Sequence, residues 1–477
     1  LLLLVHLAMA LTWEGIWALI GRLWREARWA RGVPALAALA FWLAALPSPR
    51  PERLAEARGQ TRGQARDIVL ITLDTFRADL YPDYTPTLVE LSERGRRYTQ
   101  AVTTAPLTAP AHASMLSGLE VREHGLLANG RQLKVGSVVE DLHAAGYTTG
   151  AFLGAQVLDR HTGLGAGFDH YDDRWGLVQR MDWHPLISWL ALEGRGHQRA
   201  GVKVIERALS WRSEQHGPTF TWIHLYDAHA PYGQPLGHGP TAEEIEGARE
   251  ADQTALSRRD GMQSLVEFLN SARPNEQTLR YRAGGRYVDH LVGTVFDGLS
   301  GQELVVVVGD HGESLTEHDY DFNHGRRLYE PSLHVPLLVL HPELQAETVE
   351  ALAGVTQVAD WLRWGAGVGE QPSALTQLRV YTTGQQAHGT AIRPRDRRLE
   401  HTRAAALRLD GAKLLLHPDR ASGQWFDLRV DPWELDPQPV PEVLLDELEE
   451  LRAMVSDKPA GLDEEQRRRL EALGYVE

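Results

Sequence analysis

Short runs of almost continuously apolar residues are the feature that most constrains how this chain can fold. A strand with one face in water alternates apolar and polar residues, whereas these runs contain few polar positions, so each predicts a strand buried on both faces. The runs are Asp67–Leu73 (DIVLITL), Thr148–Gly154, Thr219–Tyr226, Glu303–Val308 (ELVVVV) and Val335–Leu340. Helical patterns lie between them, including Thr85–Gly95, Val135–Ala145, Val202–Gln215 and Tyr287–Leu299. This alternation predicts an α/β fold with a mostly parallel central sheet and helices on both faces.

The character of the sequence changes at several points, and these changes divide the chain into segments. A polar, helix-prone stretch at 233–280 interrupts the strand–helix rhythm and is interpreted as an insertion. Beyond about residue 370 the patterns are those of antiparallel strands followed by a helix, as in a smaller α+β subdomain. We therefore expect a hydrophobic membrane-anchoring part at 1–49, a linker at 50–66, a catalytic domain at 67–370 and a C-terminal subdomain at 371–477.

The first residues of the chain are hydrophobic enough to suggest a membrane segment. Leu1–Ile20 is almost wholly apolar and about long enough to cross a bilayer, and Val33–Leu46 is apolar again after a stretch with four arginines. Two interpretations stay open: a signal-peptide core behind a basic region, or a membrane hairpin with a cytosolic arginine loop, which we favour. Both place the residues from Pro47 onward outside the cytoplasm. The expected location is the cell membrane, with a periplasmic or extracellular catalytic domain.

Charge and cysteine content exclude some functions. The chain carries 64 acidic against 49 basic residues, a formal charge of −15, which makes nucleic acid an unfavourable partner. It contains no cysteine. Disulfides, thiolate metal sites and a cysteine nucleophile are therefore excluded.

Acidic residues and histidines follow three of the apolar runs directly. Asp74 follows the first run directly in LITLDT, Asp227 and His229 lie in WIHLYDAHAPY, and Asp310 and His311 lie in VVGDHGES. In open α/β sheets functional groups gather at the carboxyl ends of the strands. A single Asp in such a place is often only a cap for the next helix. Carboxylates and imidazoles at three strand ends together indicate a site for a divalent cation.

A fourth candidate element is PLTAPAHASMLSG, Pro106–Gly118. Thr108 precedes Pro110, a residue well suited to the first turn of a helix, and His112 follows one turn later. A hydroxyl at this end of a helix faces the backbone N–H groups and the positive end of the helix dipole, which favour an anion. Thr108 is thus a candidate nucleophile, with an ordinary N-cap role as the alternative.

These motifs together resemble those of sulfatase-like members of the alkaline phosphatase superfamily. The resemblance rests on the order and spacing of DIVLITLDTFRAD, PLTAPAHASMLSG, WIHLYDAHAPY, VVVVGDHGESLTEH and NHGRRLYEPSLHVPLLVL. It extends from about residue 67 to the end of the chain, through VTQVADWLRWGAG and GQWFDLRVDPWE, and leaves out the hydrophobic N-terminal part.

The resemblance implies roles for individual residues. It identifies Asp74, Thr108, Asp310 and His311 as ligands of one divalent metal ion, which would be Mn, Ca, Mg or Zn. It makes Thr108 the nucleophile and assigns His112, His229 and His324 to the catalytic site, where histidines would hold the anionic group of the substrate. His112 stands where sulfatases have an arginine, and His318 has either a supporting or a direct role. A second metal ion, held with Asp227 and His229, is the open alternative to substrate binding by His229.

Two departures from the family pattern bear on the reaction. Sulfatases oxidise a Cys or Ser at the Thr108 position to formylglycine, and threonine cannot give that aldehyde. The second Asp of the family's usual pair is replaced by Thr75. Threonine nucleophiles occur in relatives that act on phosphorus, such as nucleotide phosphodiesterases, lipoteichoic acid synthases and phosphoethanolamine transferases.

The expected function is therefore that of a metal-dependent hydrolase or transferase acting on phosphate-type esters. The expected partner is an anionic ester substrate, with an envelope glycan or lipid suggested by the membrane segment. One alternative is a sulfatase that works without formylglycine. Another is a non-catalytic, membrane-anchored binding protein of the same fold. A nucleotide-binding protein is disfavoured because no glycine-rich phosphate loop follows the first strand.

Overall fold

A computed structural model describes residues 65–173, 198–232, 240–258, 276–385, 403–417 and 420–456 of the chain. All of them belong to one compact unit, Arg58–Glu477. Within these ranges no helix combines the length and the apolar character needed to cross a membrane. The predicted membrane segment at 1–49 lies outside the described residues, so the membrane location stays a prediction.

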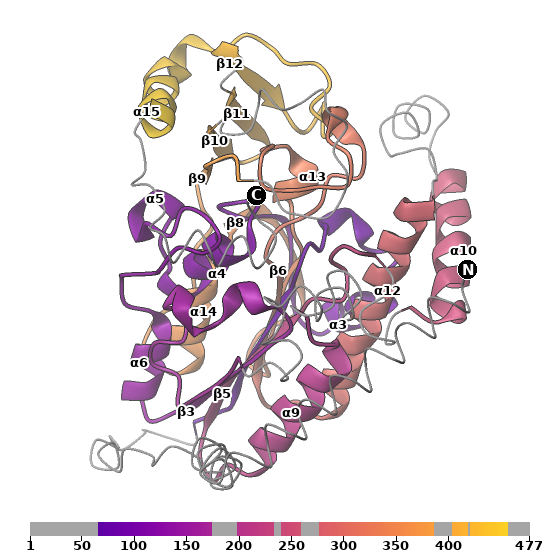
Figure 1. The fold of residues 1–477 in the computed structure, drawn as a ribbon, viewed down its shortest axis with the longest axis vertical. Helices are drawn as coiled ribbons and strands as arrows, with labels where there is room; N and C mark the ends of the chain where they lie inside the picture. Colours follow the sequence, from indigo (N-terminus) through magenta and orange to yellow (C-terminus); the bar gives the residue numbers. More distant parts are fainter. Residues whose placement is uncertain are drawn as a thin grey trace, which may run out of the picture. The chain divides into compact units, whose positions relative to one another are not determined.

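The core of this unit is an eight-stranded mixed sheet, which runs through the middle of Figure 1. In spatial order its strands are β4 (His170–Asp172), β3 (Thr148–Leu153), β5 (Thr219–Leu225), β1 (Ile68–Leu73), β6 (Leu304–Gly309), β7 (Leu337–Leu340), β2 (Arg96–Val102) and β8 (Glu347–Gly354). Among these strands only β7 runs against the others, because it pairs antiparallel with both β6 and β2. The mostly parallel sheet is therefore confirmed, with one reversed strand that the sequence did not indicate.

Helices cover both faces of the sheet (Figure 1). Alternate residues of β1 separate the two hydrophobic cores, since Ile68 and Leu70 pack into one and Val69 and Ile71 into the other. The first core contains α4 (Thr108–Ser117), α6 (Val138–Ala144) and α14 (Gln357–Gly365). The second contains α3 (Pro86–Ser92), α9 (Gly201–Ser213) and α12 (Glu276–Asp297). This arrangement explains why β1 is apolar at almost every position.

The stretch interpreted as an insertion forms helical structure where it is described. Helix α10 (Ala242–Arg258) packs on α12, and α12 begins at Glu276, before the expected end of the insertion at 280. Helix α12 is therefore longer than the predicted Tyr287–Leu299, because its first turns are too polar to show an apolar stripe.

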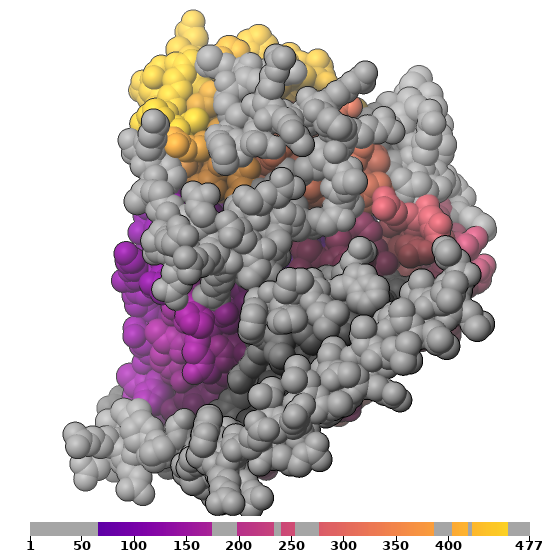
Figure 2. Space-filling view, viewed as in Figure 1, coloured from indigo at the N-terminus to yellow at the C-terminus, as the bar shows by residue number. Residues whose placement is uncertain are grey.

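A second, antiparallel sheet lies in the C-terminal part of the unit, in the order β12 (Arg420–Asp427), β11 (Ala412–His417), β10 (Ala404–Leu409) and β9 (Gln377–Thr382). Helix α15 (Leu445–Ser456) packs its Leu448 and Leu451 against this sheet. Figure 2 shows the described C-terminal residues, orange to yellow, gathered at one end of the unit. These elements fall within the expected α+β subdomain, whose boundaries stay a prediction.

Short helical turns complete the described structure. They are η3 (Ala78–Leu80), α5 (Val121–His124), η4 (Gln156–Leu158), η5 (Arg160–Thr162), η7 (Glu317–Asp319), α13 (Glu330–Leu333) and η9 (Glu442–Leu444).

Candidate active site

Two carboxylates meet where neighbouring parallel strands end. Strands β1 and β6 pair in register up to Leu73 and Gly309, so Asp74 and Asp310 are the next residue on each strand. The backbone N–H of Asp310 continues the ladder by donating to the Leu73 carbonyl at 3.1 Å. Both side chains are fully buried. One oxygen of each, Asp74 Oδ1 and Asp310 Oδ2, has no hydrogen-bond partner among the described residues.

The orientation of the Asp310 carboxylate is fixed by the backbone around it. Its Oδ1 accepts the N–H groups of Thr75 at 3.1 Å and His311 at 2.7 Å, which leaves Oδ2 open. Thr75 adopts a left-handed conformation with φ of 51°, which is unfavourable for a β-branched residue. The Tyr281 hydroxyl holds it there by donating to the Thr75 carbonyl at 2.7 Å. Backbone strain is thus concentrated beside the two carboxylates.

His311 completes a set of three candidate metal ligands. Its Nδ1 donates to the Gly312 carbonyl at 2.9 Å, so the neutral ring carries its lone pair on Nε2. That nitrogen lies 3.7 Å from Asp310 Oδ2 and 4.0 Å from Asp74 Oδ1. The ligand atoms of Asp74, Asp310 and His311 all lie within 4.8 Å of one another. A histidine that donates through one nitrogen to a carbonyl and presents the other is typical of metal sites.

Thr108 begins helix α4 and faces this group. Its Oγ1 lies 3.4 Å from His311 Nε2. The N-cap residue of the helix is Leu107, whose own side chain makes no capping hydrogen bond. Thr108 is therefore the first residue of the helix and not its cap, and its hydroxyl is turned toward His311 from the positive end of the helix dipole.

The raised pKa values of the Asp74 and Asp310 carboxyl groups favour a cation between them. Burial raises the pKa of the Asp310 carboxyl well above its usual value, and the neighbouring Asp74 carboxylate raises it further. Burial also raises the pKa of Asp74. Two buried carboxylates without a positive partner are unfavourable, and a divalent cation relieves both.

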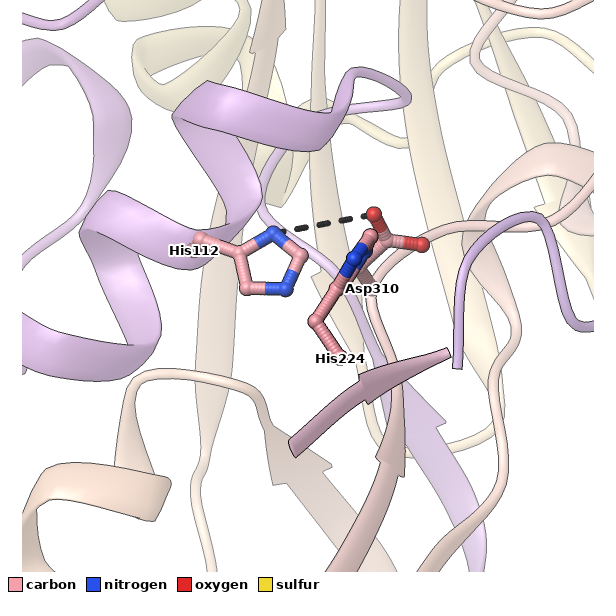
Figure 3. A group of neighbouring side chains, drawn as sticks. All are labelled: His112, His224 and Asp310. Atoms are coloured by element: carbon pink, nitrogen blue, oxygen red, sulfur yellow. Dashed lines mark ion pairs between the residues drawn. The ribbon is translucent and has the colours of Figure 1, made fainter. Parts of the chain in front are cut away.

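A second group, His112, His224 and Asp310, also brings its ligand atoms within 4.8 Å (Figure 3). His112 extends from α4 toward Asp310, with its Nδ1 3.7 Å from Asp310 Oδ2, as the dashed line shows. Both ring nitrogens of His112 are already engaged, since Nδ1 lies 2.8 Å from the Thr108 carbonyl and Nε2 lies 3.0 Å from Thr72 Oγ1. The group of His112, His224 and Asp310 therefore offers too few free ligand atoms to bind a metal ion. His224 instead donates from Nε2 to Asp74 Oδ2 at 3.2 Å and so supports that carboxylate.

His229 and His324 each present one free nitrogen. His229 Nδ1 donates to the Ala230 carbonyl at 2.7 Å, and His324 Nδ1 donates to Glu313 Oε1 at 3.1 Å. Their Nε2 atoms are buried and have no partner among the described residues. The His324 ring lies 4.3 Å from that of His311 and 5.3 Å from that of His229. Burial lowers the pKa of His229 to about 4, which favours a neutral ring at pH 7.

Two other residues singled out from the sequence, Asp227 and His318, make contacts that support the fold. Asp227 Oδ1 accepts the N–H of Gly201 at 3.0 Å and so caps the start of α9. It does not join either group of candidate metal ligands found among the described residues. The His318 ring stacks on Tyr329 at 3.6 Å between centroids.

Asn129 is a residue that the sequence reasoning missed. Its Oδ1 accepts the N–H of Ala109, next to Thr108, at 3.0 Å. Its Nδ2 is buried and has no partner among the described residues. Glu313, which orients His324, was missed too. Neither residue follows an apolar run directly, and an isolated Asn or Glu carries no signal of its own.

Comparisons with known proteins identify relatives of this chain. The sulfatase family model matches residues 66–365. Arylsulfatase K from Bos taurus is 22% identical over 344 residues, which cover 63% of this chain and 63% of the bovine protein. Choline-sulfatase from Rhizobium meliloti is 25% identical over 325 residues, which cover 58% of this chain and 62% of that protein. The match thus spans a little under two thirds of these relatives.

Solved structures share the fold. The phosphonate monoester hydrolase of Agrobacterium radiobacter has a TM-score of 0.57 and 16% identity, with 84% of this chain and 98% of that one covered. A structure in complex with its substrate D-glucosamine-2-N,6-O-disulfate has a TM-score of 0.57 and 15% identity, with 86% and 98% covered.

Proposed function

Because this chain belongs to the sulfatase family, whose model spans residues 66–365, we propose that it hydrolyses or transfers phosphate-type esters through Thr108. The observation that carries the proposal is the position of the Thr108 hydroxyl, 3.4 Å from His311 Nε2, at the start of a helix. The same His311 nitrogen lies 4.0 Å from Asp74 Oδ1 and 3.7 Å from Asp310 Oδ2, the two carboxylate oxygens without a hydrogen-bond partner among the described residues.

The residues at the site fit a divalent cation. Asp74 Oδ1, Asp310 Oδ2, His311 Nε2 and the Thr108 hydroxyl are the atoms that would hold it, and they combine oxygen with imidazole donors. When bound, such a cation lowers the pKa of the Thr108 hydroxyl and neutralises charge on an ester oxygen.

Thr108 acts as the nucleophile in this proposal. Its oxygen attacks the phosphorus, the ester bond to the leaving alcohol breaks, and a phosphothreonine forms. A water molecule that attacks the phosphothreonine makes the protein a hydrolase, and a second alcohol makes it a transferase. In both cases the hydroxyl of Thr108 is restored.

The substrate's anionic group would be held by donors around Thr108. The free amide Nδ2 of Asn129 suits a non-bridging oxygen of the ester. His229, which donates through Nδ1, presents its Nε2 without a partner among the described residues, and this nitrogen contacts either the substrate or a second cation. Glu313 orients His324 in a similar way, so that its Nε2 also contacts either the substrate or a second cation. The second ion stays the alternative to direct substrate binding.

Sulfate-ester hydrolysis is the second candidate function. The relatives by sequence include an arylsulfatase and a choline-sulfatase, and one protein of the same fold is solved with a sulfated sugar. Against it stands Thr108, because threonine cannot be converted to formylglycine.

A turnover panel tests the proposal. Aryl phosphate monoester, phosphodiester, phosphonate and sulfate substrates are each assayed with Mn, Ca, Mg and Zn, on wild type and on Thr108→Ala. We expect a phosphorus ester to turn over much faster than the sulfate, and only with metal and Thr108. Sulfate turnover equal to the best phosphorus ester would favour the second candidate, and activity that survives Thr108→Ala would refute the assigned nucleophile.

A further inference from the structure

A chain of buried hydrogen bonds joins three elements of the fold to the backbone of Thr108. Trp222 of β5 donates from Nε1 to Thr72 Oγ1 at 2.9 Å. Thr72 of β1 contacts His112 Nε2 at 3.0 Å, and His112 Nδ1 contacts the Thr108 carbonyl at 2.8 Å. All three side chains are completely buried. The set Trp222, Thr72 and His112 is called the relay below.

The partners at both ends of the relay fix the direction of their hydrogen bonds. The indole N–H of Trp222 can only donate, so Thr72 Oγ1 accepts from it. The Thr108 carbonyl can only accept, so the proton of His112 is on Nδ1. With that proton on Nδ1, the lone pair of the His112 ring is on Nε2, which accepts the hydroxyl proton of Thr72. Both ring nitrogens of His112 are thereby engaged, and neither is left over for a substrate.

The relay also connects the groups of the proposed reaction. Thr72 lies two residues before Asp74 on the same strand, and His112 lies one helical turn after Thr108. The relay therefore sets the distance between the first turn of α4 and the end of β1. The Thr108 hydroxyl itself lies 3.4 Å from His311 Nε2.

We propose that the Trp222–Thr72–His112 relay is a positioning device for the nucleophile, so that His112 acts on Thr108 through its backbone and does not contact the substrate. The proposal rests on the proposed function, since it gives Thr108 a reaction to be positioned for. It gives His112 a role different from the substrate contact implied by the family arginine at this position. Figure 3 shows the His112 ring extending from α4 toward Asp310.

The most direct test removes one hydroxyl in the middle of the relay. Thr72→Val keeps the shape of the side chain but breaks both of its hydrogen bonds, whereas Thr72→Ser keeps the hydroxyl. Because a small misplacement of a nucleophile costs up to about a hundredfold in rate, we expect Thr72→Val to lower kcat by about 10- to 100-fold. KM and the amount of bound metal should stay as in wild type, since the hydrogen bonds of the Thr72 hydroxyl go to His112 and Trp222. Thr72→Ser should restore most of kcat.

Thr221→Val is the matched control. Thr221 lies on β5, is also completely buried, and its hydroxyl has no partner among the described residues. Thr221→Val makes the same exchange of a hydroxyl for a methyl group without breaking a hydrogen bond among the described residues, so kcat should stay as in wild type. A general effect of Thr→Val in this sheet would appear in this control too.

His112 variants give a second, independent readout if Thr72→Val does not fold. His112→Asn keeps an N–H near the position of Nδ1 and can still donate to the Thr108 carbonyl, whereas His112→Leu cannot. We expect His112→Asn to retain clearly more kcat than His112→Leu, at similar KM.

Several outcomes would overturn the proposal. They are wild-type kcat in Thr72→Val, an equal loss in Thr72→Ser and Thr72→Val, or a rise in KM in place of a fall in kcat. The failure of the proposed function is distinguishable, because Thr108→Ala would then stay active. If Thr108→Ala is inactive and Thr72→Val is normal, only the relay proposal fails.

Discussion

The protein buries charged side chains in two regions, and the two regions differ in how these charges are neutralised. In the C-terminal region Glu330 contacts Arg408 at 3.3 Å and Lys413 at 3.1 Å, and Lys413 also contacts Glu434. Each of these charges meets an opposite charge from the chain itself. At the carboxyl ends of β1 and β6, Asp74 Oδ1 and Asp310 Oδ2 meet none among the described residues. We call the cluster of Glu330, Arg408, Lys413 and Glu434 the closed region, because its charges neutralise one another. We call the group around Asp74 and Asp310 the open region, because buried carboxylates without a positive partner indicate a site for a cation.

The pKa values express the same contrast. Burial on its own would raise the pKa of Glu330, but Arg408 and Lys413 together lower it below its usual value. For Asp310 burial and the neighbouring Asp74 act in the same direction, and the pKa is raised well above its usual value. The pKa shifts of Glu330 and Asp310 thus have opposite directions, because Glu330 lies beside two cations of the chain and Asp310 lies beside another carboxylate.

The largest expected effect is on the reaction at the open region. Thr108→Ala removes the proposed nucleophile and should lower kcat by about 10⁴-fold or more. Thr108→Ser keeps a hydroxyl and should retain part of the activity. Thermal unfolding should be little changed, because the Thr108 hydroxyl has only the 3.4 Å contact to His311. Steady-state kinetics on the best substrate, with unfolding curves of all three proteins, give the answer. Comparable rates in wild type and Thr108→Ala would contradict the account.

The next effect is on the closed region. Glu330→Gln leaves Arg408 and Lys413 facing one carboxylate, and breaking a buried ion pair in this way costs about 3–5 kcal/mol of stability. Urea unfolding measures that loss, and metal binding by the folded protein should be unchanged. A variant as stable as wild type would mean that the cluster is not an essential part of the fold.

A smaller effect is expected where a neutral side chain supports the open region. His224 donates from Nε2 to Asp74 Oδ2 at 3.2 Å. Loss of such a supporting hydrogen bond typically lowers metal affinity about 10- to 100-fold, so His224→Leu should bind a divalent cation that much more weakly. His224→Gln, which keeps an N–H donor, serves as the control. Equal affinity in wild type and His224→Leu, measured by metal titration, would remove His224 from the site.

The smallest effect should have the opposite sign. Asp310→Asn makes the same carboxylate-to-amide change as Glu330→Gln, but it relieves the repulsion from Asp74. Removing a strained functional group commonly stabilises a protein by about 0.5–2 kcal/mol, and we expect a gain of this size in metal-free protein. Urea unfolding in the presence of a chelator measures it. A loss of stability like that of Glu330→Gln would erase the difference between the two regions.

The open region could be predicted from the sequence to a large extent. Asp74, Asp310 and His311 follow long apolar runs, and parallel neighbouring strands bring such ends together. Thr108 was indicated by its place before Pro110. Asn129, Glu313 and His224 could not be recognised, because their roles depend on side-chain contacts that no local sequence pattern indicates.

The closed region and the sheet edge could not be predicted. Glu330 and Lys413 lie far apart in the sequence, and the NHGRRLYEPSLHVPLLVL motif, which contains Glu330, gives no sign of a partner at Lys413. Strands β2 and β8 were missed since most of their residues are only half-buried or exposed, so their sequences lack the apolar runs of the central strands. The reversed direction of β7 follows from how the chain returns to the sheet, which local sequence does not encode.

The most direct test of the account is the amount of divalent metal bound to the purified protein. Wild type and Asp310→Ala are loaded with Mn or Zn, freed of unbound metal by dialysis and analysed for metal per chain. The account predicts close to one ion per chain in wild type and close to none in Asp310→Ala, with loss of activity in the variant. Two ions in wild type would add a second site, to which His229 and His324 are the open candidates. Equal metal content in both proteins would contradict the claim that Asp310, with Asp74, His311 and Thr108, holds the catalytic cation.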